Sequence, residues 1–431
     1  MIKLVIIADD LTGALDTGVQ FTKKNMSVAV TQNLDLDFEK EFSDRDVVVI
    51  DTESRHISKE EAKEKVKAII SKFSKDKIEF FYKKVDSTLR GNIGSEIEGF
   101  VESIGINEVS FIPAFPSGKR IVKNGILYVD GIKLENTQFA HDILNPINDS
   151  YIPEIIKKQS KLEVEKADIN NLKLSKSQNF KIYLFDSENN NDMEIIGAEL
   201  FKRKLLNYTV GNAGFAEVLA NYIDTEDKKE EILIEDKKIF FVCGSVNIVS
   251  LEQCKVAEEI GFLSKALKFD NIISENYISS NKYVEDKRFI SDKFKISEKV
   301  LLKTSDSDKV IENALNFSKS HNIPIEKLTK IIADNTGRLV TNIIKENGVR
   351  NLIVFGGDTL IGILKNIECE YIIPIKEILP GVVFTKVVLK NKSFINVITK
   401  AGGFGEKNLI TKVDIFLKDK YKKMEGMKLF L

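Results

Sequence analysis

The chain has 431 residues, roughly three times the length of a common single domain, so two domains of unequal size are the simplest expectation. Hydrophobic residues make up 43% and charged residues 30%, with 24 Gly and 7 Pro, which excludes a disordered or collagen-like chain. Lys and Arg number 64 against 65 Asp and Glu, so the net charge of −1 provides no attraction for nucleic acid or anionic membranes. We therefore expect neither a nucleic-acid partner nor a membrane partner.

The three cysteines, Cys243, Cys254 and Cys369, form no Cys-x-x-Cys pair, which favours a reducing compartment over a disulfide framework. With only three histidines to help, a zinc site is not expected. The apolar run at residues 4–8 is too short for a signal peptide or a membrane span. We therefore expect a cytoplasmic protein.

Short apolar, β-branched runs recur along the chain, each followed by Gly, Asp, Ser or Pro and then by a helical pattern. This alternation predicts an α/β fold with two domains, each with a largely parallel β-sheet flanked by helices. The predicted strands are residues 3–8, 47–50, 78–82, 109–112, 183–185, 239–242, 352–355 and 394–398. Ligands of such sheets bind beyond the carboxyl ends of the strands, so the polar residues that follow a strand are the candidate site residues.

Directly after the first strand come Asp9 and Asp10, which precede a helical pattern running toward Phe21. Paired carboxylates at a strand end can hold hydroxyl groups, accept a proton or ligate Mg²⁺, whereas a helix cap by Asp10 or Thr12 is the structural alternative. A phosphatase that forms an aspartyl phosphate would have its second Asp two residues after the first, and position 11 is Leu. This disfavours that class of phosphatase.

The strand at 78–82 is followed by the polar run KKVDSTLRGN, too rich in charge to be explained by surface solvation alone. The chain has few arginines, so those it keeps at strand ends, Arg55 and Arg90, are candidates for gripping a carboxylate or phosphate with two parallel hydrogen bonds. The cations Lys83, Lys84 and Arg90 can neutralise an anion, Ser87 and Thr88 can donate hydrogen bonds, and Asp86 can take a proton from an alcohol. The predicted ligand is small, polyhydroxylated and acidic.

The strand at 109–112 is followed by PAFPSGKR, where two prolines fix a rigid loop and two cations follow a glycine. We interpret this loop as a wall that faces the ligand. Between residues 224 and 238 the sequence DTEDKKEEILIEDKK is dense in charge and is a plausible surface hinge. The predicted domains are residues 1–228 and 229–431.

In the second half the strand ends carry glycine: Gly244-Ser245, then Gly356-Gly357-Asp358-Thr359, then Lys400-Ala401-Gly402-Gly403. Glycine lets a backbone approach a phosphate, and a helix N-terminus that follows offers free N–H groups. Lys400 adds a positive charge suited to a phosphate, and Asp358 could orient Mg²⁺ or cap its helix. None of these turns matches a P-loop or a dinucleotide fingerprint, and simple turns are the alternative, but together they favour a nucleotide.

Seven motifs in order, IADDLTGALDTG, DTESRH, KKVDSTLRGNIGSEIEG, PAFPSGKR, FGGDT, LPGV and KAGGFG, resemble those of the four-carbon acid sugar kinase family over nearly the whole chain. The resemblance implies a sugar-acid-binding N-terminal domain, a nucleotide-binding C-terminal domain, and ATP-dependent phosphorylation of the terminal hydroxyl of threonate, erythronate or an oxo-tetronate. The implied sugar-acid contacts are Asp9, Asp10, Arg55, Lys84, Asp86, Ser87 and Arg90. The implied ATP contacts are Ser245, Gly356, Gly357, Asp358, Thr359, Gly402 and Gly403.

We assign the general base to Asp86, because neighbouring cations keep it ionised, with Asp9 or Asp10 as the next candidates. ATP and Mg²⁺ are the expected cofactors, and no metal ligands are assigned. At Gly118-Lys119-Arg120-Ile121 the chain departs from the Gly-Arg-Thr-Thr common in the family, which changes the contacts of that loop.

Two other functions stay open at this point: a Mg²⁺-dependent sugar-phosphate phosphatase using Asp9 or Asp10, and a non-catalytic regulator that binds two metabolites. We expect that the protein can form a homodimer.

Overall fold

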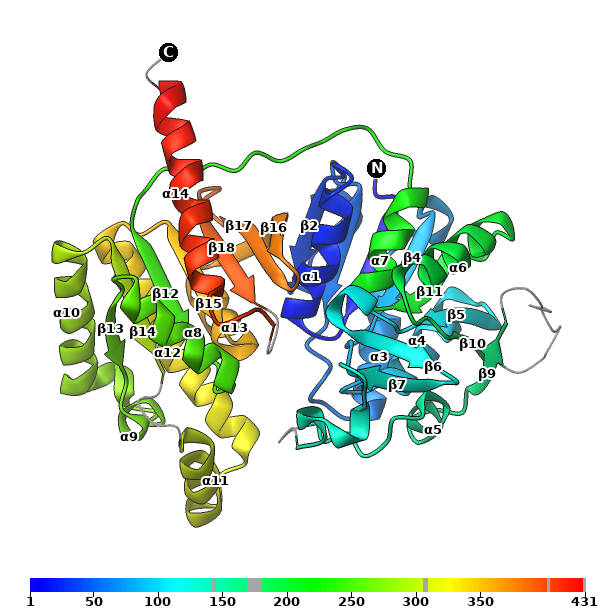
Figure 1. Cartoon of the computed structure of the whole chain (residues 1–431), viewed down its shortest axis with the longest axis horizontal. Coiled ribbons are helices and arrows are strands. Elements are labelled where there is room, and N and C mark those ends of the chain that lie inside the picture. Colours follow the sequence, from blue (N-terminus) through cyan, green and yellow to red (C-terminus); the bar gives the residue numbers. More distant parts are fainter. Residues whose placement is uncertain (142–144, 169–179, 305–308, 401–403, 429–431) are drawn as a thin grey trace. The chain divides into compact units, whose positions relative to one another are not determined.

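The computed structural model describes residues 1–141, 145–168, 180–304, 309–400 and 404–428 (Figure 1). The chain divides into two compact units, Met1–Glu230 and Glu231–Leu431. Each unit has a mostly parallel sheet with helices packed on it, so the predicted two-domain α/β class is confirmed.

The sheet of the N-terminal unit has the strand order β2-β3-β1-β4-β11-β5-β10-β9, and its neighbouring strands are parallel. Its strands are β1 (Leu4–Ala8), β2 (Val28–Thr31), β3 (Val47–Asp51), β4 (Phe80–Lys84), β5 (Glu108–Ile112), β9 (Glu163–Ala167), β10 (Lys181–Phe185) and β11 (Tyr208–Gly211). The central strands β1, β3 and β4 are buried along their whole length, because helices cover both faces of the sheet.

Helices pack in pairs on this sheet: α1 contacts α7, and α3 contacts α4. The helices are α1 (Leu11–Thr22), α2 (Phe38–Glu41), α3 (Lys59–Ile70), α4 (Ile93–Ile104), α5 (Ile152–Lys157), α6 (Asn190–Lys202) and α7 (Ala213–Leu219), with 3-10 turns η1 (Lys75–Lys77), η2 (Pro116–Gly118), η3 (Leu134–Asn136), η4 (Gln138–His141) and η5 (Ala220–Tyr222). A small antiparallel sheet, β6 (Arg120–Lys123), β7 (Ile126–Val129) and β8 (Ile132–Lys133), follows the PAFPSGKR loop. This small sheet was not predicted from the sequence.

The sheet of the C-terminal unit has the order β13-β14-β12-β15-β18-β17-β16. Its strands are β12 (Ile239–Cys243), β13 (Leu263–Ala266), β14 (Lys299–Lys303), β15 (Asn351–Phe355), β16 (Cys369–Leu379), β17 (Val382–Leu389) and β18 (Phe394–Lys400). Within this order the first five strands, β13, β14, β12, β15 and β18, are parallel to their neighbours. Strand β17 pairs antiparallel with both β18 and β16.

Helices α8 and α14 pack together in this unit, and α12 packs against α13 and α10. The helices are α8 (Ile248–Glu259), α9 (Phe269–Ile272), α10 (Asn281–Ile296), α11 (Val310–His321), α12 (Ile325–Asn347), α13 (Gly357–Asn366) and α14 (Leu409–Lys428), with the 3-10 turn η6 (Tyr277–Ser279). Aromatic side chains such as Phe241 and Phe355 form the core between the sheet, α8 and α14, with ring centroids 4.7 Å apart. The Lys-rich C-terminal segment is helical.

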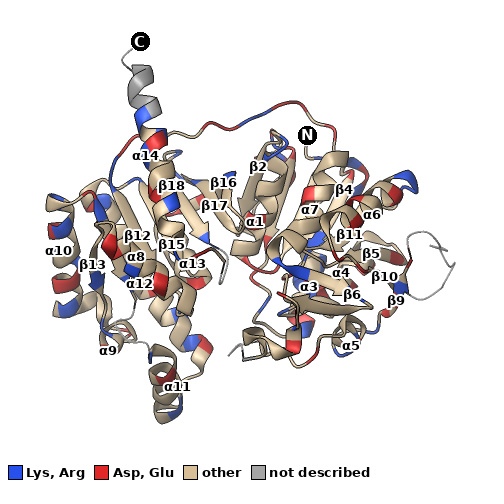
Figure 2. Cartoon of the chain, viewed as in Figure 1, with Lys and Arg blue, Asp and Glu red and all other residues tan. Residues whose placement is uncertain are grey.

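Basic and acidic residues are interspersed along the helices of each unit, for example on α10 (Figure 2). Within the described part of the chain, no helix is both long and apolar enough to cross a membrane.

Candidate active site

Three loops of the N-terminal unit leave the same edge of the sheet, because β1, β3 and β4 are parallel and in register. Ala8 is paired with Asp51 of β3, and Ile7 with Lys83 of β4. The residues that follow these strands therefore meet at the carboxyl ends, where parallel sheets bind their ligands. Six charged residues meet there: Asp9, Asp10, Arg55, Lys84, Asp86 and Arg90. We call these six the charged cluster.

Arg55 is the residue that joins all three aspartates of the charged cluster. Its Nε donates to Oδ2 of Asp9 at 2.7 Å, and its Nη2 lies 2.7 Å from Oδ1 of Asp10 and 3.4 Å from Oδ1 of Asp86. Arg55 is only 8% exposed, so these ion pairs lie in a medium of low polarity. The planar guanidinium of Arg55 therefore fixes the positions of three carboxylates that come from two different loops.

Lys84 makes a second link between the first two aspartates. Its Nζ lies 3.1 Å from Oδ1 of Asp9 and 3.0 Å from Oδ1 of Asp10. This approach requires a glycine at position 13, because a Cβ there would fall 1.8 Å from the Lys84 Nζ. Asp10 is also the N-cap of α1, accepting from the Gly13 backbone N–H at 3.2 Å. The cap and the ligand-facing role were alternatives in the sequence analysis, and the cap is confirmed.

Asp86 is held by its own loop as well as by Arg55. Arg90 donates from Nε to Oδ2 at 2.9 Å and from Nη2 to Oδ1 at 3.1 Å, and the Thr88 hydroxyl donates to Oδ2 at 2.5 Å. The fork of Arg90 thus grips both oxygens of a carboxylate of its own loop, whereas the sequence analysis expected it to grip a ligand. Ser87 lies half-buried in the same loop.

The pKa values of the three aspartates reflect these contacts. Burial alone would raise the pKa of Asp9, but Arg55 and Lys84 outweigh it and hold that pKa below its ordinary value. The pKa of Asp86 is likewise held far below its ordinary range, because Arg90 and Arg55 overcome the effect of burial. Arg55 and Lys84 also hold the pKa of Asp10 below its ordinary value against the effect of burial, so the three carboxylates are ionised at neutral pH and can accept hydrogen bonds from hydroxyl groups.

Lys83 does not join the charged cluster, which corrects the prediction that it neutralises a ligand. Its side chain is fully buried, lies 2.7 Å from Oε2 of Glu96 on α4, and donates to the carbonyls of Ile7 and Lys84. Successive strand residues point to opposite faces, so Lys84 reaches α1 and Lys83 reaches α4. The role of Glu96 was not predicted from the sequence. The one sequence feature that could have indicated it is the position of this acidic residue on the apolar face of the helix that follows Asn92.

Two further residues fix the loop that carries Arg55. Glu96 accepts a hydrogen bond from the Ser54 hydroxyl at 2.5 Å, and Asn92 donates from its side chain to the carbonyls of Ser54 and Ile57, both at 2.9 Å. The backbone on either side of Arg55 is therefore anchored to the start of α4.

Asp51, the last residue of β3, is a buried carboxyl beside the charged cluster. It accepts from Gln32 Nε2 at 2.8 Å and from the Glu53 backbone N–H at 3.0 Å. Burial raises the pKa of Asp51 to about 6, and the negative charge of Asp10 adds to this effect. Asp51 therefore titrates near neutral pH, unlike Asp9 and Asp86.

In the C-terminal unit the loops after β12 and β15 approach each other closely. Gly356 has φ +112°, and a Cβ at Gly244 would fall 1.8 Å from Oγ1 of Thr359, so both positions require glycine. Helix α13 begins directly after Gly356 without a side-chain cap, which leaves its first N–H groups pointing out of the helix end. Gly357, Asp358 and Thr359 form its first turn. Ser245 follows β12, and its hydroxyl accepts from the backbone N–H of Asn247.

Lys400 ends β18 and is buried rather than open to solvent. Its Nζ donates to the Ser250 hydroxyl at 3.0 Å and lies 4.8 Å from the centre of the Phe355 ring. Burial lowers the pKa of Lys400 to about 8. Gly402 and Gly403, predicted to contact ATP, lie outside the described residues. Within the described part of the chain, no cluster of His, Cys, Asp and Glu has the arrangement of a metal site.

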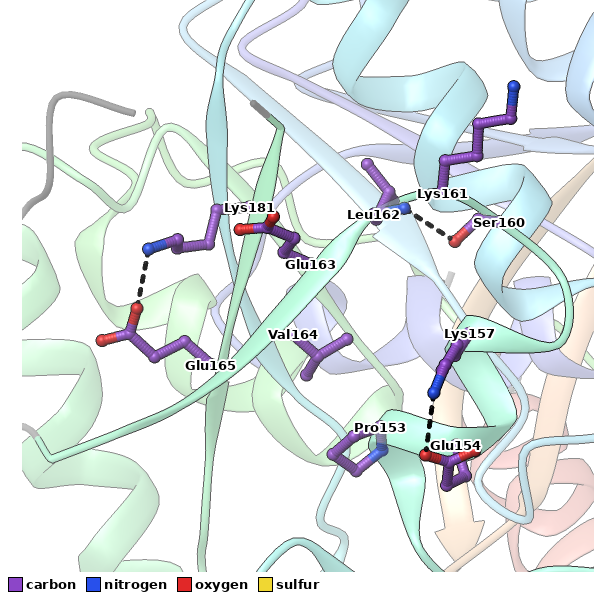
Figure 3. A pocket seen from close by; sticks show the side chains of 10 residues that line it. All are labelled: Pro153, Glu154, Lys157, Ser160, Lys161, Leu162, Glu163, Val164, Glu165 and Lys181. Carbon is purple, nitrogen blue, oxygen red and sulfur yellow. Dashed lines mark hydrogen bonds and ion pairs between the residues drawn. The ribbon is translucent and has the colours of Figure 1, made fainter. Parts of the chain in front are cut away.

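A groove at the outer edge of the N-terminal sheet, beside β9 and α5, is an alternative site in that unit (Figure 3). Two of its cations are paired: Lys157 lies 3.6 Å from Glu154, and Lys181 lies 2.8 Å from Glu165. Lys157, Glu154 and Glu165 are exposed to water, whereas most side chains of the charged cluster are buried, so charges in this groove are screened more strongly.

Comparison with known proteins decides the family. A model of the sugar-binding N-terminal domain matches residues 4–219, and a model of the nucleotide-binding C-terminal domain matches residues 240–410. The chain belongs to the four-carbon acid sugar kinase family.

Three named kinases of this family resemble the chain in sequence. The chain is 26% identical to a D-threonate kinase from Salmonella typhimurium, an alignment that covers 97% of this chain and 99% of that protein. It is 32% identical to a D-erythronate kinase from Heliobacterium modesticaldum over 60% of this chain and 61% of that protein. It is 23% identical to a 3-oxo-tetronate kinase from Haemophilus influenzae over 94% of this chain and 97% of that protein.

Solved structures agree with the fold of this family. A protein from Salmonella typhimurium LT2 superimposes with a TM-score of 0.78 at 19% identity, covering 96% of this chain and 99% of that one. A Haemophilus influenzae protein gives a TM-score of 0.68, also at 19% identity, over 97% of this chain.

Proposed function

We propose that the protein is an ATP-dependent kinase that phosphorylates the terminal hydroxyl, on carbon 4, of a four-carbon sugar acid such as threonate, erythronate or 3-oxo-tetronate. Membership of the four-carbon acid sugar kinase family supports the reaction class, a phosphotransferase with an alcohol as acceptor. The named relatives act on three different tetronates, so the substrate is proposed as a class rather than a single compound.

The observation that carries the proposal is the charged cluster. Its arginine and lysine side chains suit the carboxylate of a sugar acid, and its three ionised aspartates suit several hydroxyl groups. A small, polyhydroxylated acid satisfies both kinds of group.

We assign Asp86 as the group that accepts the proton of the attacking hydroxyl, with Asp9 and Asp10 as the next candidates. The low pKa of Asp86 makes it ionised and therefore able to accept a hydrogen bond, but a weak base. Phosphoryl transfer tolerates a weak base, because its loose transition state depends mainly on positioning and charge neutralisation. The main work of Asp86 is then to orient the hydroxyl.

We place ATP at the C-terminal unit, at the loops that contain Ser245, Gly356, Gly357, Asp358 and Thr359. The uncapped N-terminus of α13 offers N–H groups and a partial positive charge to a phosphate. Mg²⁺, which is retained largely by nucleotide phosphates and water in kinases, is expected to arrive with ATP, and Asp358 is a carboxylate that could reach it. Lys400, the last residue of β18, is the remaining proposed ATP-binding residue and would contribute a positive charge.

The test is a panel of four-carbon acids incubated with the purified protein and Mg-ATP, with ADP release as the measurement. Saturable ADP release with at least one tetronate is expected. Absence of both turnover and ATP binding would refute the proposal. Phosphate release from sugar phosphates without ATP would instead identify a phosphatase, and tight binding of both ligands without turnover would identify a regulator.

A further inference from the structure

Lys119 and Arg120, the two cations of the PAFPSGKR loop, have opposite surroundings. Lys119 has φ +63°, is 68% exposed in its side chain, and forms an ion pair of 3.1 Å with Asp130, which is equally exposed. Arg120 begins β6 and is half-buried. The left-handed backbone at Lys119 thus sends one cation to the solvent and the next into the protein.

Arg120 lies beside Arg90 of the charged cluster. The central carbon of the Arg90 guanidinium is 5.6 Å from the centre of the Phe139 ring, and that of Arg120 is 6.0 Å from the same centre. Both arginines also interact with Asp86, which Arg90 grips with two nitrogens. Two guanidinium groups therefore lie against one aromatic ring, and the charge of Asp86 attracts both.

Placing two cations together in a partly buried position costs free energy. Burial lowers the pKa of Arg120, and repulsion from Arg90 opposes the attraction of Asp86. A further anion bound between the two guanidinium groups would reduce this repulsion. The planar, delocalised guanidinium is the side chain best suited to hold a carboxylate with two parallel hydrogen bonds.

We propose that Arg120, together with Arg90, forms the subsite that holds the carboxylate of the sugar acid, so that Arg120 determines the preference for acids over uncharged polyols. This inference deepens the proposed function and rests on it. Phe139 closes the subsite as an apolar wall on which both guanidinium groups lie. The positive charge and planar shape of the Arg120 guanidinium favour a planar anion, a carboxylate, as the ligand group.

The experiment compares Arg120→Gln and Arg120→Lys with the wild type and with Lys119→Gln, a control that removes the neighbouring exposed cation. A hydrogen bond to a charged group contributes about 1.5–3 kcal/mol, which corresponds to about 10- to 100-fold in affinity. Arg120→Gln should therefore raise the KM for D-threonate or D-erythronate about 10- to 100-fold, with kcat and the KM for ATP changed by less than about threefold. Arg120→Lys should give an intermediate KM, because an ammonium keeps the charge but loses the fork. Lys119→Gln should match the wild type.

Calorimetric binding of the same acids without ATP separates this inference from the proposed function. If the wild type binds tetronates without phosphorylating any, the kinase proposal fails, while loss of binding in Arg120→Gln still supports the subsite. Weak erythritol binding, equal in the wild type and Arg120→Gln, is expected because erythritol lacks the carboxylate.

Three results would overturn the inference: an unchanged KM for the acid in Arg120→Gln, an effect confined to the KM for ATP, or an equal effect in Lys119→Gln. Thermal melting checks that each variant is folded. If Arg120→Gln has a lower melting temperature than the wild type, the test rests on Arg120→Lys. A KM for the acid equal to that of the wild type in Arg120→Lys would then contradict the proposal.

Discussion

Arg90 grips Asp86 with two nitrogens of its side chain, a geometry that a lysine cannot reproduce. Arg90→Lys should raise the KM for the sugar acid about tenfold or more, because one charge-assisted hydrogen bond is lost and Asp86 is less firmly oriented. Steady-state kinetics with a tetronate measures this. The matched control is Arg203→Lys, since Arg203 also pairs with an acid four residues earlier, Glu199, on the surface of α6. Equal kinetics of both variants would remove Arg90 from the site.

Asp86 is proposed to orient the attacking hydroxyl and accept its proton. Asp86→Asn keeps the shape of the side chain and removes its charge, so kcat should fall by about 10²- to 10⁴-fold while ATP binding changes little. Single-turnover kinetics and nucleotide titration give the two quantities separately. Normal turnover in this variant would shift the role to Asp9 or Asp10.

Asp51 links stability to pH through its raised pKa of about 6. Between the ordinary pKa of an aspartate and about pH 6, Asp51 holds a proton in the folded protein but has released it in the unfolded chain. Asp51 therefore favours the folded state most at low pH, and this contribution is lost as the pH rises through 6. Asp51→Asn should therefore gain stability relative to the wild type as pH rises from 4.5 to 7.5, by about 2 kcal/mol. Urea denaturation at the two pH values measures the difference. A difference that is constant with pH would contradict the raised pKa.

At the scale of elements, β4 and α4 are joined by the buried pair Lys83–Glu96. Breaking a buried ion pair by removing one partner costs about 3–5 kcal/mol. Lys83→Met should accordingly destabilise the N-terminal unit by an amount near the lower end of that range, because the pKa of Glu96 is already raised by burial and the acid can take up a proton. The double variant Lys83→Met/Glu96→Gln should recover part of the loss. Urea unfolding followed by circular dichroism measures both, and an unaffected single variant would contradict this account.

The residues of the charged cluster could be predicted because each one follows a strand that is recognisable as an apolar run. Asp9 and Asp10 follow β1, Arg55 follows β3, and Asp86 follows β4. The role of Lys83 was predicted wrongly, because β4 ends at Lys84, two residues later than the apolar run suggests. Once both lysines belong to the strand, alternation sends one of them to each face.

Contacts between distant segments were not predictable in the same way. The Lys83–Glu96 pair and the Arg120–Phe139 contact depend on how α4 and η4 pack. The local sequence around these residues does not indicate that packing. The antiparallel strands β16 and β17 were also missed, because the predicted α/β alternation gives no reason to expect two successive strands without a helix between them. The burial of Lys400 was missed for the same reason, since Ser250 and Phe355 come from two other elements.

At the scale of the whole molecule, length predicted two domains and the alternation of apolar runs with helical patterns predicted the α/β class, and both the structure and the family models agree with this class. The near-zero net charge means that the recognition of an anionic substrate depends on local clusters rather than on the overall field. The charged cluster is such a local device, and its ion pairs are buried enough to escape screening by salt. Substrate affinity should therefore depend on these few side chains much more than on ionic strength.

The most direct test of the central claim is the identity of the product. The protein is incubated with Mg-ATP and D-threonate or D-erythronate, and the product is examined by ³¹P NMR and mass spectrometry. The account predicts an acid that carries one added phosphoryl group on its terminal oxygen, formed in equal amount with ADP. A phosphoryl group on another oxygen, or ATP hydrolysis with the acid left unchanged, would contradict it.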